Sequence, residues 1–472
     1  MLTYQDILAV PKNDRERADF VRKVISEHKS SDLYRTAKIA DDYDRGLNTT
    51  ISTYQKTLTT VTGRIVPDRW SAVHRSTSNF FGIFTTQLTN YLLGNGVEWG
   101  ESSTAEKLGK DFDTRLHQAG RAALCGGVSF GFWNLDHMEV FTPLNFAPLY
   151  DEETGALTAG VRFWQIDTSK PLRAELYELD GYTSYLWSKK TIPKEPWKKI
   201  ADETFMRPKR TYVVHFQESA ADGTEILDGE NYPTFPIVPL WANPHKQSEL
   251  VGLREKIDAY DFILNGFEND LDNAQIYWII KGAGGMDDLD LSQFLERLHF
   301  TGAAAPADGQ DVAPVEINIP YEARERLLDR LEKQLYKDAM ILNPTDIANG
   351  AATATQIRAA YEPQNNKADL FEFCVLDFLQ GILAVAGIED EATFTRSKVV
   401  NQKEEVQTVI SAADYLGEEY VTRKILNILG DGDQAEDILK QLEADAEDRL
   451  SEMDNQVNQA NNGGDGENQL EE

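Results

Sequence analysis

The stretch FPIVPLWANPHKQSELVGLREKIDAYDFILNGFENDL, residues 235–271, decides the fold class of this chain. Its first part is punctuated by prolines, which favours an extended linker. Its second part predicts a long helix, because apolar residues recur alternately three and four positions apart over three heptads. These apolar residues are Leu250, Leu253, Ile257, Tyr260, Leu264, Phe267 and Leu271.

The apolar row of this helix allows two interpretations. In one, the helix packs only on its own domain. In the other, it packs side by side with helices of neighbouring chains, and the spacing alone does not choose between them. The opposite face is strongly charged and carries Arg254, Glu255, Asp258, Asp261 and Glu268.

The residues after this helix predict a small insert and a second long helix. Strands are expected at 276–280 and 315–319, with a short helix at 290–298 between them. The second long helix begins after Pro320. One side of it carries Leu327, Leu328, Leu331, Leu335 and Ala339. Residues 250–340 therefore predict two long helices that bracket a compact αβ tip.

Outside residues 250–340, the residue pattern predicts different secondary structure in successive regions of the chain. Residues up to about 130 predict mainly helices, including one from Trp70 to Leu93, whereas 128–241 has the alternation and turn residues of antiparallel strands. Residues 343–355 predict a polar flexible loop, followed by a long helix to Ala386. The predicted fold class is therefore α+β and predominantly α-helical.

The net charge of the chain limits how it can bind nucleic acid. Its 472 residues include 78 acidic and 47 basic side chains, a net charge of −31. Proteins that grip DNA by neutralising phosphates are basic, so this chain is not expected to hold DNA tightly over most of its surface. DNA that only passes along an acidic wall would be kept from adhering.

A search for catalytic and metal-binding motifs finds none. There is no GxxxxGK[ST] loop, no HExxH pair and no GxSxG elbow, and the two cysteines, Cys125 and Cys374, lack disulfide or zinc spacing. The sequence therefore predicts no cofactor, no metal site, no membrane segment and no enzymatic activity. Acidic pairs such as Asp41–Asp42 and Asp287–Asp288 leave a metal-dependent nuclease as an alternative.

Four segments, in order along residues 40–400, resemble the portal proteins of tailed double-stranded DNA bacteriophages, in the Gp6-like branch of long-tailed phages. One departure is Asn349-Gly350, where that family often has Ser-Gly. The segments are YDRGLNTTI (43–51), RWSAVHRSTSNFFGIFTTQLTNYLLGNGVEW (69–99), the stretch at 235–271, and NGAATATQIRAAYEPQNNKADLFEFCVLDFL (349–379).

The resemblance implies a portal fold with named parts. They are a wing (1–240, β-rich from about 128), a linker and first stem helix (241–273), a clip (274–320), a second stem helix (321–341), a tunnel loop (342–355), a long helix returning to the wing (356–400), a helical crown (401–450) and a disordered acidic tail (451–472).

The resemblance also implies a function. The family assembles a ring of twelve copies at one capsid vertex, a channel for DNA packaging and ejection. Implied partners are double-stranded DNA, the large terminase motor, head–tail adaptors, and the major capsid and scaffold proteins, in a virion assembled in the host bacterial cytoplasm. Another head-completion protein of the virion is the nearest alternative. The seven apolar residues of the first stem helix would pack between subunits. The DNA-facing residues would be Asn343, Thr345, Asp346, Asn349, Thr353 and Thr355.

Overall fold

A computed structural model describes most of the chain, and it separates into two units. The first comprises Met1–Asp346 with Tyr361–Ser397, and the second Ile347–Ala360 with Lys398–Glu472. The described residues are 2–10, 14–59, 64–67, 73–192, 195–219, 225–273, 277–281, 311–315, 321–346, 354–397, 402–429, 435 and 438–441.

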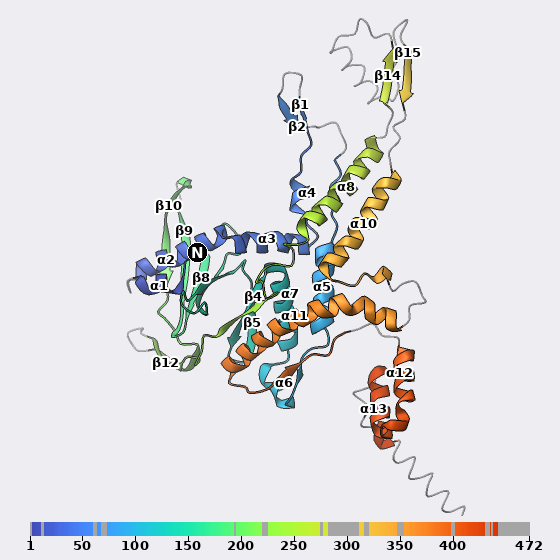
Figure 1. Ribbon diagram of the computed structural model, residues 1–472. Coiled ribbons are helices and arrows are strands. Elements are labelled where there is room, and N and C mark those ends of the chain that lie inside the picture. The colour runs from blue at the N-terminus through green and yellow to red at the C-terminus, as the bar shows by residue number, and fades with distance from the viewer. Residues whose placement is uncertain are drawn as a thin grey trace, which may run out of the picture. The chain divides into compact units, whose positions relative to one another are not determined.

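The N-terminal part is mainly helical, as predicted (Figure 1). Two of its helices are capped by local side chains: the Ser31 hydroxyl accepts from the Tyr34 amide, and Asn48 accepts from the amides of Thr50 and Ile51. The helices are α1 (Tyr4–Ala9), α2 (Asp14–Ser30), α3 (Asp32–Asp44), α4 (Thr49–Thr53), α5 (Phe80–Leu93), α6 (Ser102–Leu108) and α7 (Phe112–Gly126). Short strands β1 (Thr57–Thr59) and β2 (Ile65–Pro67) pair with each other, and β3 (Glu98–Trp99) pairs with β16 (Ala392–Thr393).

The helix predicted from Trp70 is shorter than expected. It begins at Phe80, and residues 73–79 are not helical. The physical reason is that backbone amides of this segment donate to side chains of a distant helix, and those hydrogen bonds replace the ones a helix would supply.

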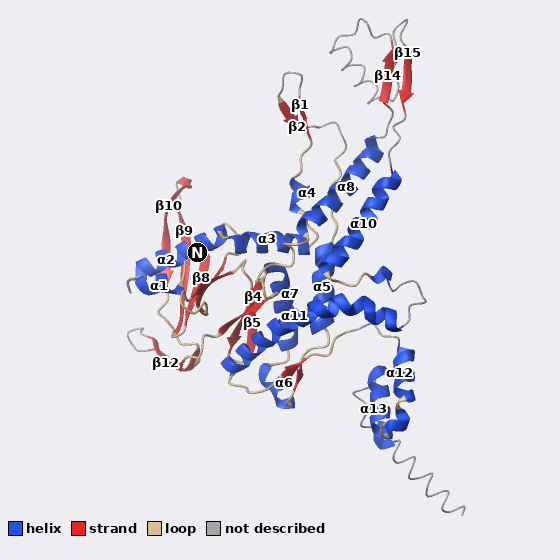
Figure 2. Cartoon of the chain, viewed as in Figure 1, coloured by secondary structure: helices blue, strands red, loops and turns tan. Residues whose placement is uncertain are grey.

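The antiparallel strands predicted over 128–241 are confirmed (Figure 2). One sheet has the order β10-β9-β8-β7-β6, a second has the order β13-β4-β5, and β11 pairs with β12. The strands are β4 (Val128–Asn134), β5 (His137–Phe141), β6 (Phe146–Tyr150), β7 (Leu157–Trp164), β8 (Leu172–Glu178), β9 (Gly181–Ile192), β10 (Glu195–Met206), β11 (Val213–Ser219), β12 (Glu225–Glu230) and β13 (Ile237–Trp241).

The proline-rich stretch predicted as a linker is partly a strand. Within it, β13 pairs with β4, and Pro239 lies opposite Phe130. Proline cannot donate to a neighbouring strand, so it is tolerated here because β13 is an edge strand of its sheet.

The two long helices are α8 (Arg254–Asn273) and α10 (Tyr321–Ala339), and they pack side by side (Figure 1). The first begins at Arg254, four residues after Leu250, where the apolar row of the predicted helix starts. Residues 250–253 form turns instead, closed by the Leu253 amide donating to the Leu250 carbonyl at 2.9 Å. The second agrees with its prediction.

Between the two helices in sequence lies an antiparallel pair, β14 (Tyr277–Lys281) and β15 (Asp311–Val315). The first strand agrees with the prediction. The second lies four residues earlier than the expected 315–319, because its pairing register joins Asp311 to Lys281 and Val315 to Tyr277. The helix expected at 290–298 lies outside the described residues.

After α10 come a short 3-10 turn at Pro344–Asp346 and the long helix α11 (Ala354–Ala386), which confirms the helix predicted there. The second unit contains α12 (Gln402–Ser411), a 3-10 turn at Ala413–Tyr415 and α13 (Glu418–Leu429), in agreement with the predicted helical region. The tail expected to be disordered, 451–472, lies outside the described residues.

Two buried clusters hold the β-rich part together. In one, α1 and α2 pack Ile7, Val21 and Val24 on the five-stranded sheet. In the other, aromatic rings of the three-stranded sheet, including Phe130 and Phe132, meet Tyr177 and Tyr212. None of the helices in the described part of the chain combines the length and apolar character that crossing a membrane requires.

Candidate functional site

The α8–α10 pair is joined to the N-terminal part through one polar face of α8. We call Asp258, Asp261, Asn265 and Asn269 the polar row of α8; they lie three, four and four positions apart and so follow one helix face. Each member accepts a hydrogen bond from a residue more than 180 positions away.

Three members of the polar row hold the extended segment 73–79. The amides of His74 and Ser76 donate to the Oδ1 atoms of Asn269 and Asn265, each at 2.7 Å, and the Ser78 amide donates to Asp261 Oδ1 at 3.0 Å. Four residues of helix rise about 6 Å and two residues of extended chain about 6.6 Å, so the two spacings match. The segment is therefore bound as if along a strand edge, with side chains in place of a partner strand.

The other end of the polar row binds the segment around α4. Asn48 Nδ2 donates to Asp258 Oδ1 at 2.9 Å and to Asp261 Oδ2 at 2.7 Å, and Thr50 Oγ1 donates to Asp258 Oδ2 at 3.0 Å. The Tyr43 hydroxyl donates to the same Asp258 carboxylate. Asp258 and Asp261, which the sequence places on a charged helix face, therefore find their hydrogen-bond partners within the chain.

Burial decides the electrostatics of the polar row. Asp261 is 0% exposed, and this burial raises the pKa of its carboxyl group in spite of the hydrogen bonds from Ser78 and Asn48, which lower it. Burial also raises the pKa of Tyr43, and its hydrogen bond to Asp258 acts in the same direction.

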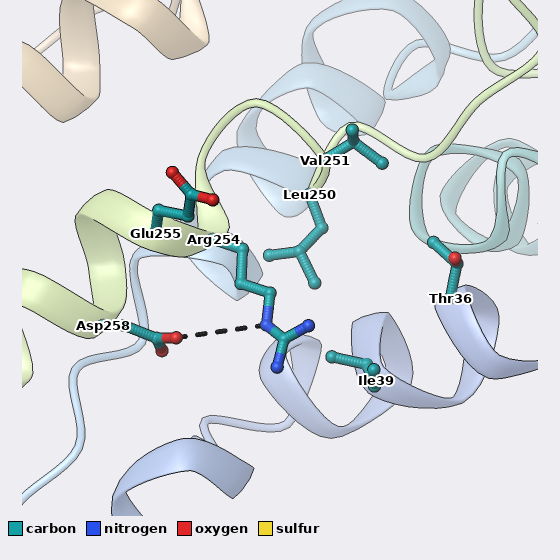
Figure 3. A pocket seen from close by; sticks show the side chains of 7 residues that line it. All are labelled: Thr36, Ile39, Leu250, Val251, Arg254, Glu255 and Asp258. Carbon is teal, nitrogen blue, oxygen red and sulfur yellow. Dashed lines mark ion pairs between the residues drawn. The ribbon is translucent and has the colours of Figure 1, made fainter.

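A pocket of about 330 Å³ lies where α3 meets the start of α8. Figure 3 shows the Arg254 guanidinium between Asp258 and Ile39, with Arg254 Nε 4.0 Å from Asp258 Oδ2. Thr36, Leu250, Val251 and Glu255 complete the lining. The pocket is lined by one ion pair and aliphatic groups, and it belongs to the packing junction between α3 and α8.

The seven apolar residues of the predicted helix divide into two sets. Leu250, Leu253 and Ile257 are 2%, 4% and 1% exposed in the single chain, so the chain itself covers them. Tyr260, Leu264 and Phe267 are half-buried, and Leu271 is 55% exposed. Packing on a neighbouring chain thus stays a prediction for the last four residues, whereas the first three belong to the core of this chain.

The half-buried aromatic residues of α8 contact α10 and α5. The Tyr260 ring meets Phe80 edge-on at 5.0 Å. The Arg324 guanidinium of α10 lies 5.9 Å from the centre of the Phe267 ring and forms an ion pair with Asp270 at 2.6 Å. These contacts fix α8 against both α5 and α10.

The start of the loop predicted to face DNA is anchored. Asn343 is 6% exposed, and its Oδ1 accepts from both the amide and the hydroxyl of Thr345, at 3.0 and 2.8 Å. The preceding Leu342 is held by Gln364 and Gln87, at 3.0 Å each. The buried Asn343 carboxamide therefore serves the turn and is not open to a ligand.

The other predicted loop residues are placed only in part. Thr345 is exposed, Asp346 closes the 3-10 turn, and Thr355 lies in the first turn of α11. Asn349 and Thr353 lie outside the described residues. The sequence did not indicate the polar row of α8 as a binding element, although the four-residue spacing of Asp261, Asn265 and Asn269 could have revealed it.

The carboxylates of the described residues form no group of three or more His, Cys, Asp or Glu side chains suited to a metal ion. In the first of the acidic pairs, Asp41 is paired with Arg45 at 2.9 Å. The other, Asp287–Asp288, lies outside the described residues. Cys125 and Cys374 are both free, and burial raises the pKa of each thiol.

Comparison with known proteins finds a relative among phage portal proteins. The portal protein of Clostridium phage phiCD119 is 26% identical over 203 residues, which cover 41% of this chain and 45% of that protein. The match thus spans less than half of this relative.

Solved structures give weaker likenesses. A chain in the neck of an empty gene transfer agent particle has a TM-score of 0.42 at 11% identity, covering 74% of this chain and 90% of that one. A chain in the virion of the native gene transfer agent has a TM-score of 0.39 at 12% identity, covering 74% and 89%. The assignment rests on the family model and not on these structures.

The family model spans both long helices, the β-rich region and α11. It is described as phage portal protein, SPP1 Gp6-like, and it matches residues 68–448, well over half of the chain. The chain therefore belongs to the SPP1 Gp6-like family of phage portal proteins.

Proposed function

We propose that this chain is the subunit of a ring through which double-stranded DNA enters and leaves a phage capsid. In this assignment α8 and α10 form the stem, and the segment with β14 and β15 forms the clip. Residues 342–355 form the tunnel loop, the first 240 residues the wing, and α12 with α13 the crown. The ring has twelve subunits and closes through head-to-tail contacts between identical chains.

The observation that carries the ring is the set of exposed apolar side chains on the α8–α10 pair. Phe262, Leu271, Tyr321 and Leu327 are between 38% and 57% exposed. Single exposed apolar residues are common, and Phe262 already meets the Tyr54 ring at 5.0 Å within the chain. Leu271, Tyr321 and Leu327 are therefore the side chains that we propose a neighbouring subunit covers.

The charge of the chain suits a channel for DNA. A net charge of −31 is repeated in every subunit, so most of the assembled surface repels phosphates and lets DNA slide. We assign the clip to docking of the large terminase motor and the head–tail adaptors, and the rest of the outer surface to the capsid and scaffold proteins. The ring is a component of the virion and assembles in the bacterial cytoplasm.

Electron microscopy of the purified full-length protein tests this proposal. Radially symmetric rings with a central hole are the expected result, and uniform compact monomers would contradict it. Leu327→Asp should lower the yield of rings, because it places a charge in the subunit contact. Ile166→Asp is the matched control, because Ile166 is 86% exposed in a loop of the β-rich part, and it should leave the yield unchanged.

A further inference from the structure

The outer face of α10 carries a row of positive charges in a strongly acidic chain. Arg326, Arg330, Lys333 and Lys337 lie four, three and four positions apart, so they follow one face of the helix, and all four are exposed. We call them the basic row of α10. It extends over about 16 Å of helix at 1.5 Å per residue.

The basic row faces away from the rest of its unit. Leu335 and Ala339, on the opposite side of α10, are 0% and 1% exposed, and Arg324 on that side reaches α8. The polar face of α8 is in turn occupied by the segments around Asn48 and Ser76. The basic row is therefore exposed to solvent, whereas the opposite side of α10 and the polar face of α8 are both occupied by contacts within the chain.

Among the described residues the basic row forms a single ion pair. Arg326 has Glu322 at 3.7 Å, one turn away, in an exposed pair that contributes little. Arg330, Lys333 and Lys337 form no ion pair within the part of the chain that the structure describes. A linear array of solvated cations is complementary to a linear polyanion such as the phosphate backbone.

We propose that the basic row of α10 lines the channel and contacts the phosphates of the passing DNA. The inference rests on the proposed ring and assigns the DNA contact to particular residues. After Ala339, α10 leads directly into the segment 342–355, so the basic row is continuous in sequence with the proposed tunnel loop. It supplies the positive charges that this loop lacks. The passing DNA therefore contacts a narrow band of positive charge in a channel wall that is otherwise acidic.

A second candidate partner for the basic row is an acidic surface on a neighbouring copy of the chain. An acidic row, Glu322, Glu325, Asp329 and Glu332, follows the same helix. At 3.6 residues per turn the two rows lie about a quarter-turn apart. A closed ring needs its two subunit contacts on roughly opposite flanks, and adjacent faces of one helix do not provide that. The geometry therefore favours DNA for the basic row.

The test compares full-length rings of three proteins by electron microscopy and by binding to a short DNA duplex over a range of salt concentrations. One is the wild type. The second carries Arg326→Gln, Arg330→Gln, Lys333→Gln and Lys337→Gln. The third carries the same charge change at exposed positions elsewhere, namely Lys23→Gln, Lys38→Gln, Lys107→Gln and Lys110→Gln.

We expect all three proteins to form rings, and only the α10 variant to bind DNA at least about tenfold more weakly. Its plot of log affinity against log salt should also be flatter, by about 0.9 for each phosphate that the variant no longer neutralises. The inference is overturned if α10-variant rings bind DNA as the wild type does, or if wild-type rings bind none, and in both cases the ring stands. It is also overturned if only the α10 variant fails to assemble, since the row would then be a subunit contact. Absence of rings in the wild type would overturn the proposed function itself.

Discussion

The polar row of α8 and the basic row of α10 are both charged or polar stripes at helical spacing, yet they have opposite environments. Asp261 in the first is fully buried and bound by Asn48 and Ser78, whereas Lys333 in the second is exposed. The first row holds the chain together, and the second is available to a partner. The comparison teaches that a polar stripe on a helix becomes structural or functional through residues far away in the sequence.

The largest expected effect comes from removing the carboxylate at the centre of the polar row. Asp261→Ala leaves one N–H of the Asn48 side chain and the Ser78 amide without an acceptor in a buried site. We expect a loss of about 2–4 kcal/mol in the free energy of unfolding, measured by urea denaturation. A loss below about 0.5 kcal/mol would remove the distinction between the two rows, since that is the size expected for an exposed surface change.

A graded effect is expected along the polar row. Asn265→Ala should cost about 1–3 kcal/mol, because Asn265 is 5% exposed and both accepts from the Ser76 amide and donates to the Ser76 carbonyl. Asn269→Ala should cost only about 0.5–1.5 kcal/mol, since it loses one hydrogen bond at an exposed amide. Denaturation of the two variants side by side checks the order, and the reverse order would show that segment 73–79 is not held as described.

The pH dependence of stability should carry a smaller contribution from Asp261. Burial raises the pKa of its carboxyl group in the folded chain, so the folded state holds this proton more tightly than the unfolded state does. The resulting stabilisation is fully present below the ordinary pKa of aspartic acid, and it is lost as the pH rises through the raised pKa. We therefore expect Asp261→Asn to become more favourable, relative to the wild type, as the pH rises from acid towards neutral.

Urea denaturation of both proteins across this pH range gives the difference directly, and titrating groups other than Asp261 cancel in it. A constant difference would show that the hydrogen bonds to Asp261 balance its burial, and a difference that changes in the opposite direction would show that they outweigh it.

The smallest effect is expected on the basic row. Arg330→Gln or Lys333→Gln should change the free energy of unfolding by less than about 0.5 kcal/mol, because exposed charges without fixed partners contribute little to stability. Thermal unfolding of each variant beside the wild type measures this. A large loss from either change would place the row in a contact inside the chain and end the contrast with α8.

Local signals predicted much of the fold. The second long helix was correct because Pro320 and the leucine spacing both mark α10, and the turn residues between short apolar runs placed the antiparallel strands. The predicted start of the helix ending at Leu93 was wrong, because segment 73–79 is bound by side chains of α8 nearly 200 residues away. No window of the sequence contains that information.

The candidate site was predictable only in outline. The apolar spacing from Leu250 to Leu271 correctly marked a long helix, but it could not show that Leu250 and Ile257 are covered by the chain itself. Likewise, the composition of the loop after α10 indicated polarity, whereas the burial of Asn343 depends on its hydrogen bonds to Thr345 and on the anchoring of Leu342 by α11. Spacing fixes which residues share a face, and long-range packing decides what that face meets.

A three-dimensional reconstruction of the assembled ring by cryo-electron microscopy tests the central claim most directly. We predict a ring in which Arg326, Arg330, Lys333 and Lys337 point into the central hole, while the polar row of α8 stays bound to the 73–79 segment of the same subunit. A ring with the basic row buried between subunits or turned outward, or the absence of any ring, would contradict the account.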